Sequence, residues 1–167
     1  SLEAWQFATM ATWQRASPDR VPLVSVGSEY SLLNRGADLA LRPAAASVDA
    51  HLIAWAPLGR GVLSAKYRKG VPQDSRASFS HMAPYVEPYL SERTRRVVES
   101  VCTAAEGLGV PPLAVALSWA RDRAGVAAAV VGPRTLSQLE QILDVEVVEL
   151  PPKIREALDD ATSTPVH

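Results

Sequence analysis

The stretch His51–Tyr67, HLIAWAPLGRGVLSAKY, decides how this chain folds. It opens with an almost continuous apolar run, Leu52–Trp55, and such a run is typical of a parallel strand that is covered on both faces. Pro57 then removes a backbone N–H, while Gly59 and Gly61 permit a close backbone approach or a positive φ. The pattern therefore predicts a buried strand that ends in a glycine-bearing loop.

Basic side chains follow in and after this loop, at Arg60, Lys66, Arg68 and Lys69. A strand end, a loop with glycines and nearby cations together suit a ligand that carries phosphate. A strand followed by a solvated basic loop would have the same pattern, because short glycine motifs occur widely. The stretch alone therefore leaves a phosphate site and a plain surface loop as alternatives.

The composition is that of a soluble globular domain: of the 167 residues, 47% are hydrophobic and 21% are charged. The net charge of −1 gives no basic excess of the kind that drives nucleic-acid binding. No apolar run approaches the ~20 residues that span a bilayer, and the first residues lack the basic region of a signal peptide. With Cys102 as the one cysteine, we expect a cytoplasmic protein without membrane or nucleic-acid partners and without a zinc site.

Helical and strand patterns alternate along the chain, which favours βαβ units and a parallel sheet. The predicted strands cover residues 21–27, 52–55 and 126–131. The predicted helices cover residues 2–16, 37–48, 91–108, 136–143 and 152–161, with a further helix that begins at Pro111 and Pro112. A parallel sheet of so few strands would be a poor independent domain.

Local signals mark the ends of several predicted elements. Ser91 and Thr135 are residue types that cap helix N-termini, and Gly109 suits the left-handed position after a helix. Residues 68–90 hold three prolines and little periodicity, so we expect a long irregular segment there. Loops of this length inside a compact domain are usually functional or disordered.

Five motifs follow one another in a fixed order and spacing, and together they resemble the aldo-keto reductases. They are EYSLLNR at 29–35, WAPLGRGVLSAKY at 55–67, SRASF at 75–79, ALSW at 116–119 and VVGPRTLSQLEQI at 130–142. The resemblance implies an α/β fold, the second half of a (β/α)8 TIM barrel, with strands six to eight, their helices and a carboxyl-terminal helix. Residues 1–167 would be one portion of a single domain. An unrelated open α/β sheet is the weaker alternative.

The resemblance also implies an NADP(H) site at the carboxyl ends of the strands, where such barrels bind their ligands. Trp55 matches the residue that stacks on the nicotinamide ring, Lys66 a basic residue near the phosphates, and Arg76 one in the belt that closes over the cofactor. The loop along the pyrophosphate is matched by Pro57, Leu58, Gly59, Arg60 and Gly61. The segment that holds the adenosine end is matched by Gly132, Arg134, Gln138 and Gln141. A guanidinium beside a helix N-terminus suits a 2′-phosphate.

Structural interpretations of these residues stay open, since Trp55 could belong to the core and Arg134 could be a solvated surface arginine. The chain also departs from the family pattern. Gly27 stands where family members carry a glutamine that hydrogen-bonds the nicotinamide carboxamide. Ile142 replaces an asparagine that often contacts adenine, and Gln141 replaces a glutamate. Each departure weakens the expected NADPH site without abolishing it.

The resemblance assigns no catalytic residue to this chain. The family's tetrad of aspartate, tyrosine, lysine and histidine comes from the first half of the barrel. None of the four tyrosines here matches a catalytic motif, and His51 lies at the wrong end of its strand to act at the carboxyl-end site. Reduction of a carbonyl needs an acid that protonates the developing alkoxide, and none is identifiable.

The resemblance therefore implies an NADPH-dependent oxidoreductase that reduces aldehydes or ketones to alcohols, to which this truncated chain supplies the cofactor-binding half. The alternative is a non-catalytic NADPH-binding or half-barrel interaction module, similar to the potassium-channel beta subunits. Either way we expect a partner for the exposed strand edges, which is the missing amino-terminal half-barrel or a second copy. We also expect Val24, Val26 and Ile53 to lack cover.

Overall fold

The computed structural model describes residues 2–73, 75–145 and 148–163. The strands are β1 (Ser25–Glu29), β2 (His51–Trp55) and β3 (Val126–Val130). The α-helices are α1 (Ala4–Arg15), α2 (Leu41–Ala46), α3 (Ala83–Val86), α4 (Glu92–Leu108), α5 (Pro112–Arg121), α6 (Leu136–Leu143) and α7 (Pro152–Thr162). Short 3-10 helices are η1 (Gly36–Asp38), η2 (Gly59–Ser64), η3 (Arg76–Ser78) and η4 (Glu87–Tyr89). The predicted α/β class is confirmed.

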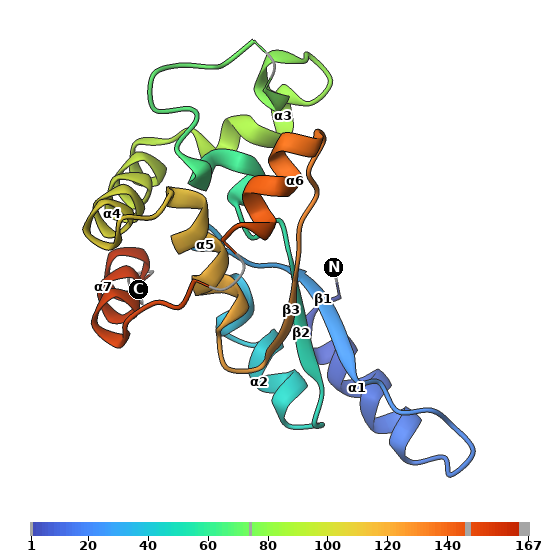
Figure 1. Cartoon of the computed structure of the whole chain (residues 1–167). Helices are drawn as coiled ribbons and strands as arrows, with labels where there is room; N and C mark the ends of the chain where they lie inside the picture. The colour runs from blue at the N-terminus through green and yellow to red at the C-terminus, as the bar shows by residue number, and fades with distance from the viewer. Residues whose placement is uncertain (1, 74, 146–147, 164–167) are drawn as a thin grey trace.

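The strands form a parallel sheet in the order β1-β2-β3. β1 pairs with β2 from Ser25 opposite His51 to Glu29 opposite Trp55. β3 pairs with the other edge of β2, and the register shifts after Leu52. The strands point the same way, so their carboxyl ends meet at one edge, where α3 and α6 lie (Figure 1). This edge carries the site described below.

Helices cover one face of the sheet, and the side chains on that face form the core. Val26, Leu52 and Ala54 alternate toward this face and are buried. The helix α2 packs against β2, and α5 packs against β3. The expectation that Val26 lacks cover is wrong, because this side chain is 7% exposed and points to the helix side.

The opposite face of the sheet is largely bare. Ile53 and Trp55 alternate toward it and are half-buried, while Ala128 and Val130 beside them are exposed. Val24, just before β1, is 64% exposed, as expected. A parallel sheet normally has both faces covered. The described residues thus present a two-layer arrangement with an apolar face open to solvent.

Two carboxylates and a set of arginines connect the end of β1 to α7. Asp38 accepts hydrogen bonds from the Tyr30 hydroxyl at 2.8 Å, Arg35 Nε at 2.9 Å and Arg42 Nε at 3.0 Å. Burial opposes ionisation of Asp38, but the hydrogen bonds from Tyr30 and Arg35 and the nearby positive charges outweigh it and lower its pKa. Asp38 is therefore a carboxylate that holds this group together.

Asp159 on α7 closes the same network from the other side. It accepts from Trp119 Nε1 at 3.0 Å and from Arg123 Nη1 at 2.5 Å, and it pairs with Arg35 at 3.2 Å. The Trp119 ring stacks on Tyr30, with 5.4 Å between ring centroids. The network therefore fixes α7 and α5 against the residue that directly follows β1.

Several predicted bounds differ from the structure. The strand predicted at 21–27 is β1, which begins at Ser25 because pairing with β2 begins there. The helix predicted at 37–48 is divided into η1 and α2, since Pro43 lies near the start of α2 and lacks the N–H that a continuous helix would need. Residues 68–90, expected to be irregular, contain the single-turn helices η3, α3 and η4.

Within the described residues, no single helix is long and apolar enough to cross a bilayer. One pair, α4 with α5, satisfies the length and composition criteria together, but it is bent by 102° at the break between the two helices.

Candidate functional site

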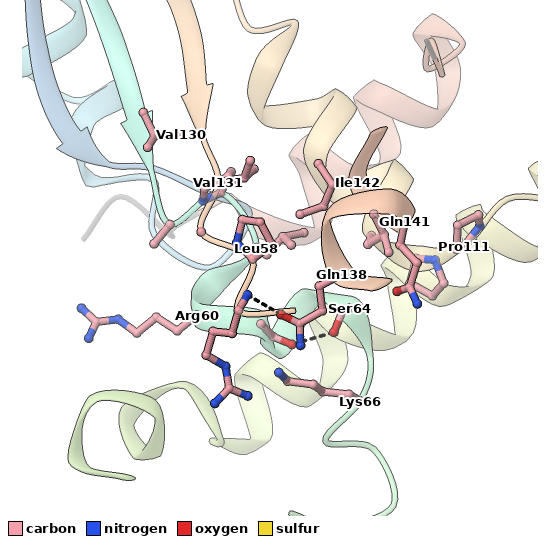
Figure 2. A pocket seen from close by; sticks show the side chains of 18 of the residues that line it. Leu58, Arg60, Ser64, Lys66, Pro111, Val130, Val131, Gln138, Gln141 and Ile142 are labelled. Carbon is pink, nitrogen blue, oxygen red and sulfur yellow. Dashed lines mark hydrogen bonds between the residues drawn. The ribbon is translucent and has the colours of Figure 1, made fainter. Parts of the chain in front are cut away.

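A pocket of about 590 Å³ opens at the carboxyl ends of β2 and β3. Its lining comes from the loop after β2, the start of α5, the end of β3 and one side of α6 (Figure 2). The volume lies in the range of small-molecule sites. The charged side chains among the described lining residues are those of Arg60, Lys66 and Arg134, and no carboxylate is among them. The pocket therefore suits an anionic ligand.

The loop after β2 has an unusual backbone. Positive φ angles occur at Ala56 (51°), Gly59 (52°), Arg60 (58°), Gly61 (92°) and Ala65 (64°). For the non-glycine residues Ala56, Arg60 and Ala65 such a conformation costs roughly 1–3 kcal/mol each, and strained conformations of this kind cluster at functional sites. Backbone hydrogen bonds from Gly59 to Ala56 and from Gly61 to Leu58 hold the turns in place. These hydrogen bonds therefore define the path of the loop along the pocket.

Gly61 is also a point of close approach. A Cβ atom at this position would lie 2.9 Å from Lys66 Nζ and 3.0 Å from Lys66 Cε. The Lys66 side chain therefore crosses directly over the space that Gly61 leaves open. This close approach places the ammonium group at the pocket, on the same side as Gln138 (Figure 2).

We expect Gly61→Ala to lower the free energy of unfolding by about 1–2 kcal/mol, because alanine disfavours the left-handed region and would displace Lys66. Gly107→Ala is the matched control, since Gly107 lies inside α4 and a Cβ there meets nothing within 4 Å. The control should raise the free energy of unfolding by roughly 0.5–1 kcal/mol. Urea denaturation measures both, and a shift of the same sign in the two variants would contradict this account.

The N-terminus of α6 faces the same pocket. Thr135 caps the helix by accepting the Gln138 N–H at 3.2 Å, as predicted. The Gln138 side chain reaches back, and its Oε1 accepts the backbone N–H of Arg134 at 2.9 Å (Figure 2). The positive end of the helix dipole and the Arg134 side chain therefore lie together at this end of the pocket.

Arg60 lines the pocket, but its guanidinium points away from Lys66 and Gln138 (Figure 2). It binds Glu29 through two nitrogens, with Nε at 3.4 Å from Oε1 and Nη2 at 3.2 Å from Oε2. Its hydrogen bond to Glu29 raises the pKa of Arg60. The charge of Arg60 is thus largely compensated within the protein.

Trp55 also lines the pocket, and on the sheet it pairs in register with Val130, another lining residue. Its indole lies close to Gly27 on the neighbouring strand, where a Cβ atom would be 4.0 Å from Trp55 Cδ1. That distance is ordinary van der Waals contact, and Gly27 has no positive φ. A Cβ atom at position 27, where the resemblance leads us to expect a glutamine, would therefore meet no close contact.

The tyrosines at this edge of the sheet are poor candidates for an acid. Burial, followed by its hydrogen bond to Asp38, raises the pKa of Tyr30 to about 12. Burial, followed by its hydrogen bond to Glu29, also raises the pKa of Tyr89. A general acid works best with a pKa near the working pH, so both shifts have the wrong direction.

The structure brings together most of the residues predicted for the cofactor site. Ten of the twelve line the pocket: Trp55, Pro57, Leu58, Arg60, Gly61, Lys66, Gly132, Arg134, Gln138 and Gln141. Gly59 is buried behind the lining, where a Cβ would lie 2.7 Å from Leu33. The side chain of Arg76 lies outside the described part of the structure. The ligand roles of all twelve residues stay predictions.

One wall of the pocket was not predicted from the sequence. The residues Pro111, Pro112 and Leu113 at the start of α5 belong to the lining. The two prolines indicate only a helix start in the sequence, and nothing in their pattern indicates a ligand. Their place in the site follows from the packing of α5 beside η2.

Comparison with known proteins identifies the family. The chain belongs to the aldo/keto reductase family, whose sequence profile matches residues 4–162. The resemblance inferred from the five motifs is thereby confirmed.

Individual relatives cover most of this chain. The uncharacterized oxidoreductase YrpG of Bacillus subtilis (strain 168) is 30% identical over 141 residues, which are 83% of this chain and 40% of YrpG. Protein tas of Escherichia coli (strain K12) is 30% identical over 130 residues, or 77% of this chain and 36% of its own length. A probable voltage-gated potassium channel subunit beta of Oryza sativa subsp. japonica is 28% identical over 151 residues, or 89% and 44%. The chain thus spans less than half of the length of these relatives.

Proposed function

We propose that this chain is the carboxyl-terminal half of a (β/α)8 aldo-keto reductase barrel and binds NADP(H) for the reduction of aldehydes or ketones to alcohols. The observation that carries the proposal is the pocket at the carboxyl ends of β2 and β3, with basic side chains and no carboxylate among its described lining residues. Barrels of this kind bind ligands at that edge, often with phosphates near the last two strands.

The residues present fit a dinucleotide phosphate. Trp55 offers a ring face for the nicotinamide, and the loop Pro57–Gly61 offers a preshaped backbone for the pyrophosphate. Lys66 would contact the phosphates. Arg134 with Gln138 and Gln141 would hold the adenosine end, next to the N-terminus of α6. Arg76 remains a predicted member of the belt over the cofactor.

When bound, NADPH supplies the hydride, and the residues of this chain bind and orient it. The pocket lining is mainly apolar around Trp55, Leu58 and Val130, which would exclude water from the nicotinamide end. The acid that protonates the substrate oxygen would come from the first half of the barrel. The raised pKa values of Tyr30 and Tyr89 support that assignment.

The half-barrel part of the proposal is supported by the bare face of the sheet. In a closed barrel, Ile53, Trp55, Ala128 and Val130 would face the interior, packed against residues from other strands. The βαβ order with helices on the opposite face is what consecutive barrel units have.

We expect the protein of 167 residues to bind NADPH without reducing a carbonyl. Titration with NADPH, followed by tryptophan quenching, should give saturable binding, because Trp55 lines the pocket. NADPH oxidation with a panel of aldehydes and ketones should not exceed the buffer blank. An absence of NADPH binding would overturn the cofactor assignment, whereas turnover would show that the chain carries an acid of its own.

A second candidate function is a non-catalytic NADPH-binding or interaction module, which the open apolar face of the sheet favours. We expect the chain to self-associate or to pair with an amino-terminal half-barrel, because the face and both sheet edges would otherwise stay exposed. Sedimentation velocity measures this directly. A monodisperse, cooperatively unfolding monomer would contradict the half-barrel placement, and binding without turnover in a complete assembly would favour the module.

A further inference from the structure

One part of the pocket differs in character from the rest, and we call it the slot between α5 and α6. Its lining comes from the start of α5, the residue after β3 and α6, and consists of Pro111, Pro112, Leu113, Val131, Gln141 and Ile142. Five of these six side chains are apolar, and none is charged. The slot therefore suits a flat, largely apolar group better than it suits a phosphate.

Packing inside the protein fixes the walls of the slot. Leu113, Val131 and Ile142 pack in one hydrophobic cluster with buried residues of α5. Pro111 and Pro112 have no backbone N–H, so they offer ring surfaces and no backbone donor. The walls thus provide shape and apolar contact, and a polar ligand atom in the slot depends on the remaining lining residue.

That residue is Gln141, whose amide is weakly held. Its Nε2 lies 3.5 Å from Ser137 Oγ, at the outer limit of a hydrogen bond. The other glutamine of the pocket is held firmly, since Gln138 Oε1 accepts a backbone N–H at 2.9 Å. Ser64 is also used within the protein, because it donates to the carbonyl oxygen of Gly61 at 2.8 Å. The amide of Gln141 is therefore available to a ligand in the slot.

The slot lies beside the phosphate end of the proposed nucleotide site. Arg134 precedes α6, Gln138 lies in its first turn, and Gln141 follows nearly one turn later, about 4.5 Å along the helix axis. In Figure 2 the Gln141 side chain lies on the side of Pro111 and away from Arg60. The 2′-phosphate is attached to the ribose that also carries the base, so a phosphate at Arg134 places the base within reach of the slot.

Two purines present opposite hydrogen-bonding groups on the same edge. Adenine has a 6-amino donor beside the N1 acceptor, whereas hypoxanthine has a 6-oxo acceptor beside an N1–H donor. An amide side chain carries both a donor and an acceptor, so it can pair with either edge when it is free to turn. An ionised carboxylate only accepts, and it would repel a 6-oxo group.

We infer that the slot between α5 and α6 binds the purine of the nucleotide and takes a 6-oxo purine as readily as adenine, because Gln141 satisfies either edge. The inference rests on the proposed NADP(H) site and deepens it. The ligand class becomes 2′-phosphorylated nicotinamide dinucleotides with a 6-amino or a 6-oxo purine. The site then selects its nucleotide by the 2′-phosphate and not by the base.

The selectivity is measured as the ratio of two Kd values, from calorimetric titrations with NADPH and with its 6-oxo analogue, reduced nicotinamide hypoxanthine dinucleotide phosphate. We expect the wild type to bind both within about threefold of each other. Gln141→Glu should bind NADPH at least about tenfold more tightly than the analogue, because a carboxylate accepts only from the 6-amino group. Gln141→Leu can neither donate nor accept, and it should weaken both nucleotides by a similar factor of about three or more.

Leu143→Glu is the matched control. It adds the same charge to α6 at a side chain that is 57% exposed and is not among the lining residues, so its ratio should equal that of the wild type. The two nucleotides carry the same phosphates and the same nicotinamide. A general loss of structure or a repulsion of the phosphates therefore weakens both and leaves the ratio unaltered.

A wild-type preference for NADPH above about threefold would overturn the inference, as would a Gln141→Glu variant with the ratio of the wild type. Where Gln141→Glu binds neither nucleotide, Gln141→Leu decides, and unchanged affinities in that variant would place the base elsewhere. If the wild type binds neither nucleotide, the proposed function fails and the inference fails with it. Binding of NADPH with the wrong ratio removes the inference alone.

Discussion

The Asp159→Ala variant is expected to lose about 3 kcal/mol of unfolding free energy. The substitution removes the acceptor of Trp119 Nε1 and leaves Arg123, with its pairing atoms 2.5 Å from Asp159, without its strongest ionic partner. Removing one partner of a buried ion pair costs roughly 3–5 kcal/mol. The Asp159 side chain is 27% exposed, which places the expected loss at the lower end of that range.

Asp160→Ala makes the same chemical change one residue further along α7, where the side chain is exposed. Its expected effect is within about 0.5 kcal/mol of zero. Urea denaturation followed by tryptophan fluorescence measures both variants, and Trp119 lies inside the network as a local reporter. Equal losses in the two variants would mean that helix propensity, and not the ion pairs, accounts for the effect.

The second large effect is expected for Arg134→Glu, which should weaken NADPH binding by at least about tenfold. A charge-assisted contact to a 2′-phosphate contributes roughly 1.5–3 kcal/mol, and 1.4 kcal/mol corresponds to a factor of ten. The position lines the pocket directly before the N-cap of α6, where backbone N–H groups also favour anions. NADH lacks the 2′-phosphate, so its affinity should change little.

Arg95→Glu is the control for the change in net charge, because Arg95 lies on α4 with a side chain that is 72% exposed. Titrations of NADPH and NADH into both variants and the wild type distinguish a contact to the 2′-phosphate from a general effect of net charge. Equal losses for the two cofactors at position 134 would mean that Arg134 supports the fold. Unchanged affinities would identify it as a surface charge, the alternative that its sequence context left open.

The sequence predicts best those elements whose ends carry local signals. α6 has its predicted bounds, and Thr135 accepts the Gln138 N–H as an N-cap does. α4 begins after Ser91, which accepts the Thr94 N–H, and ends before Gly109, whose φ is 67°. These signals act within a few residues, so they can be interpreted without the rest of the fold.

Features that depend on distant residues could not be predicted in this way. The start of β1 is set by pairing with β2, and the single turns within 68–90 are too short for helical periodicity. Val26 is buried and Val130 is exposed because the helices cover the face to which Val26 points and leave the other face open. The alternation in sequence gives two faces but does not say which one is covered.

The candidate site likewise has parts that local signals predict and parts that depend on distant residues. The loop after β2 and the turn before α6 were predictable, because glycines and basic residues mark them. The pairing of Arg60 with Glu29, 31 residues earlier, was not, and it changes the role expected for Arg60. Residue type alone indicates a cation, whereas its partner decides whether that charge is available to a ligand.

The network between Asp38 and Asp159 has a consequence for the order of events during biosynthesis. Arg35 donates to the Asp159 carbonyl and to Thr162 Oγ1, residues that are added 124 and 127 positions later. At roughly 5–20 residues per second, translation takes on the order of ten seconds to cover that separation. During this interval Asp38 is the one carboxylate of the network that has been made, with Arg35 and Arg42 as its first partners, while β1 can already pair with β2. Docking of α7 is therefore a late event, and it completes a charge balance that the nascent chain lacks.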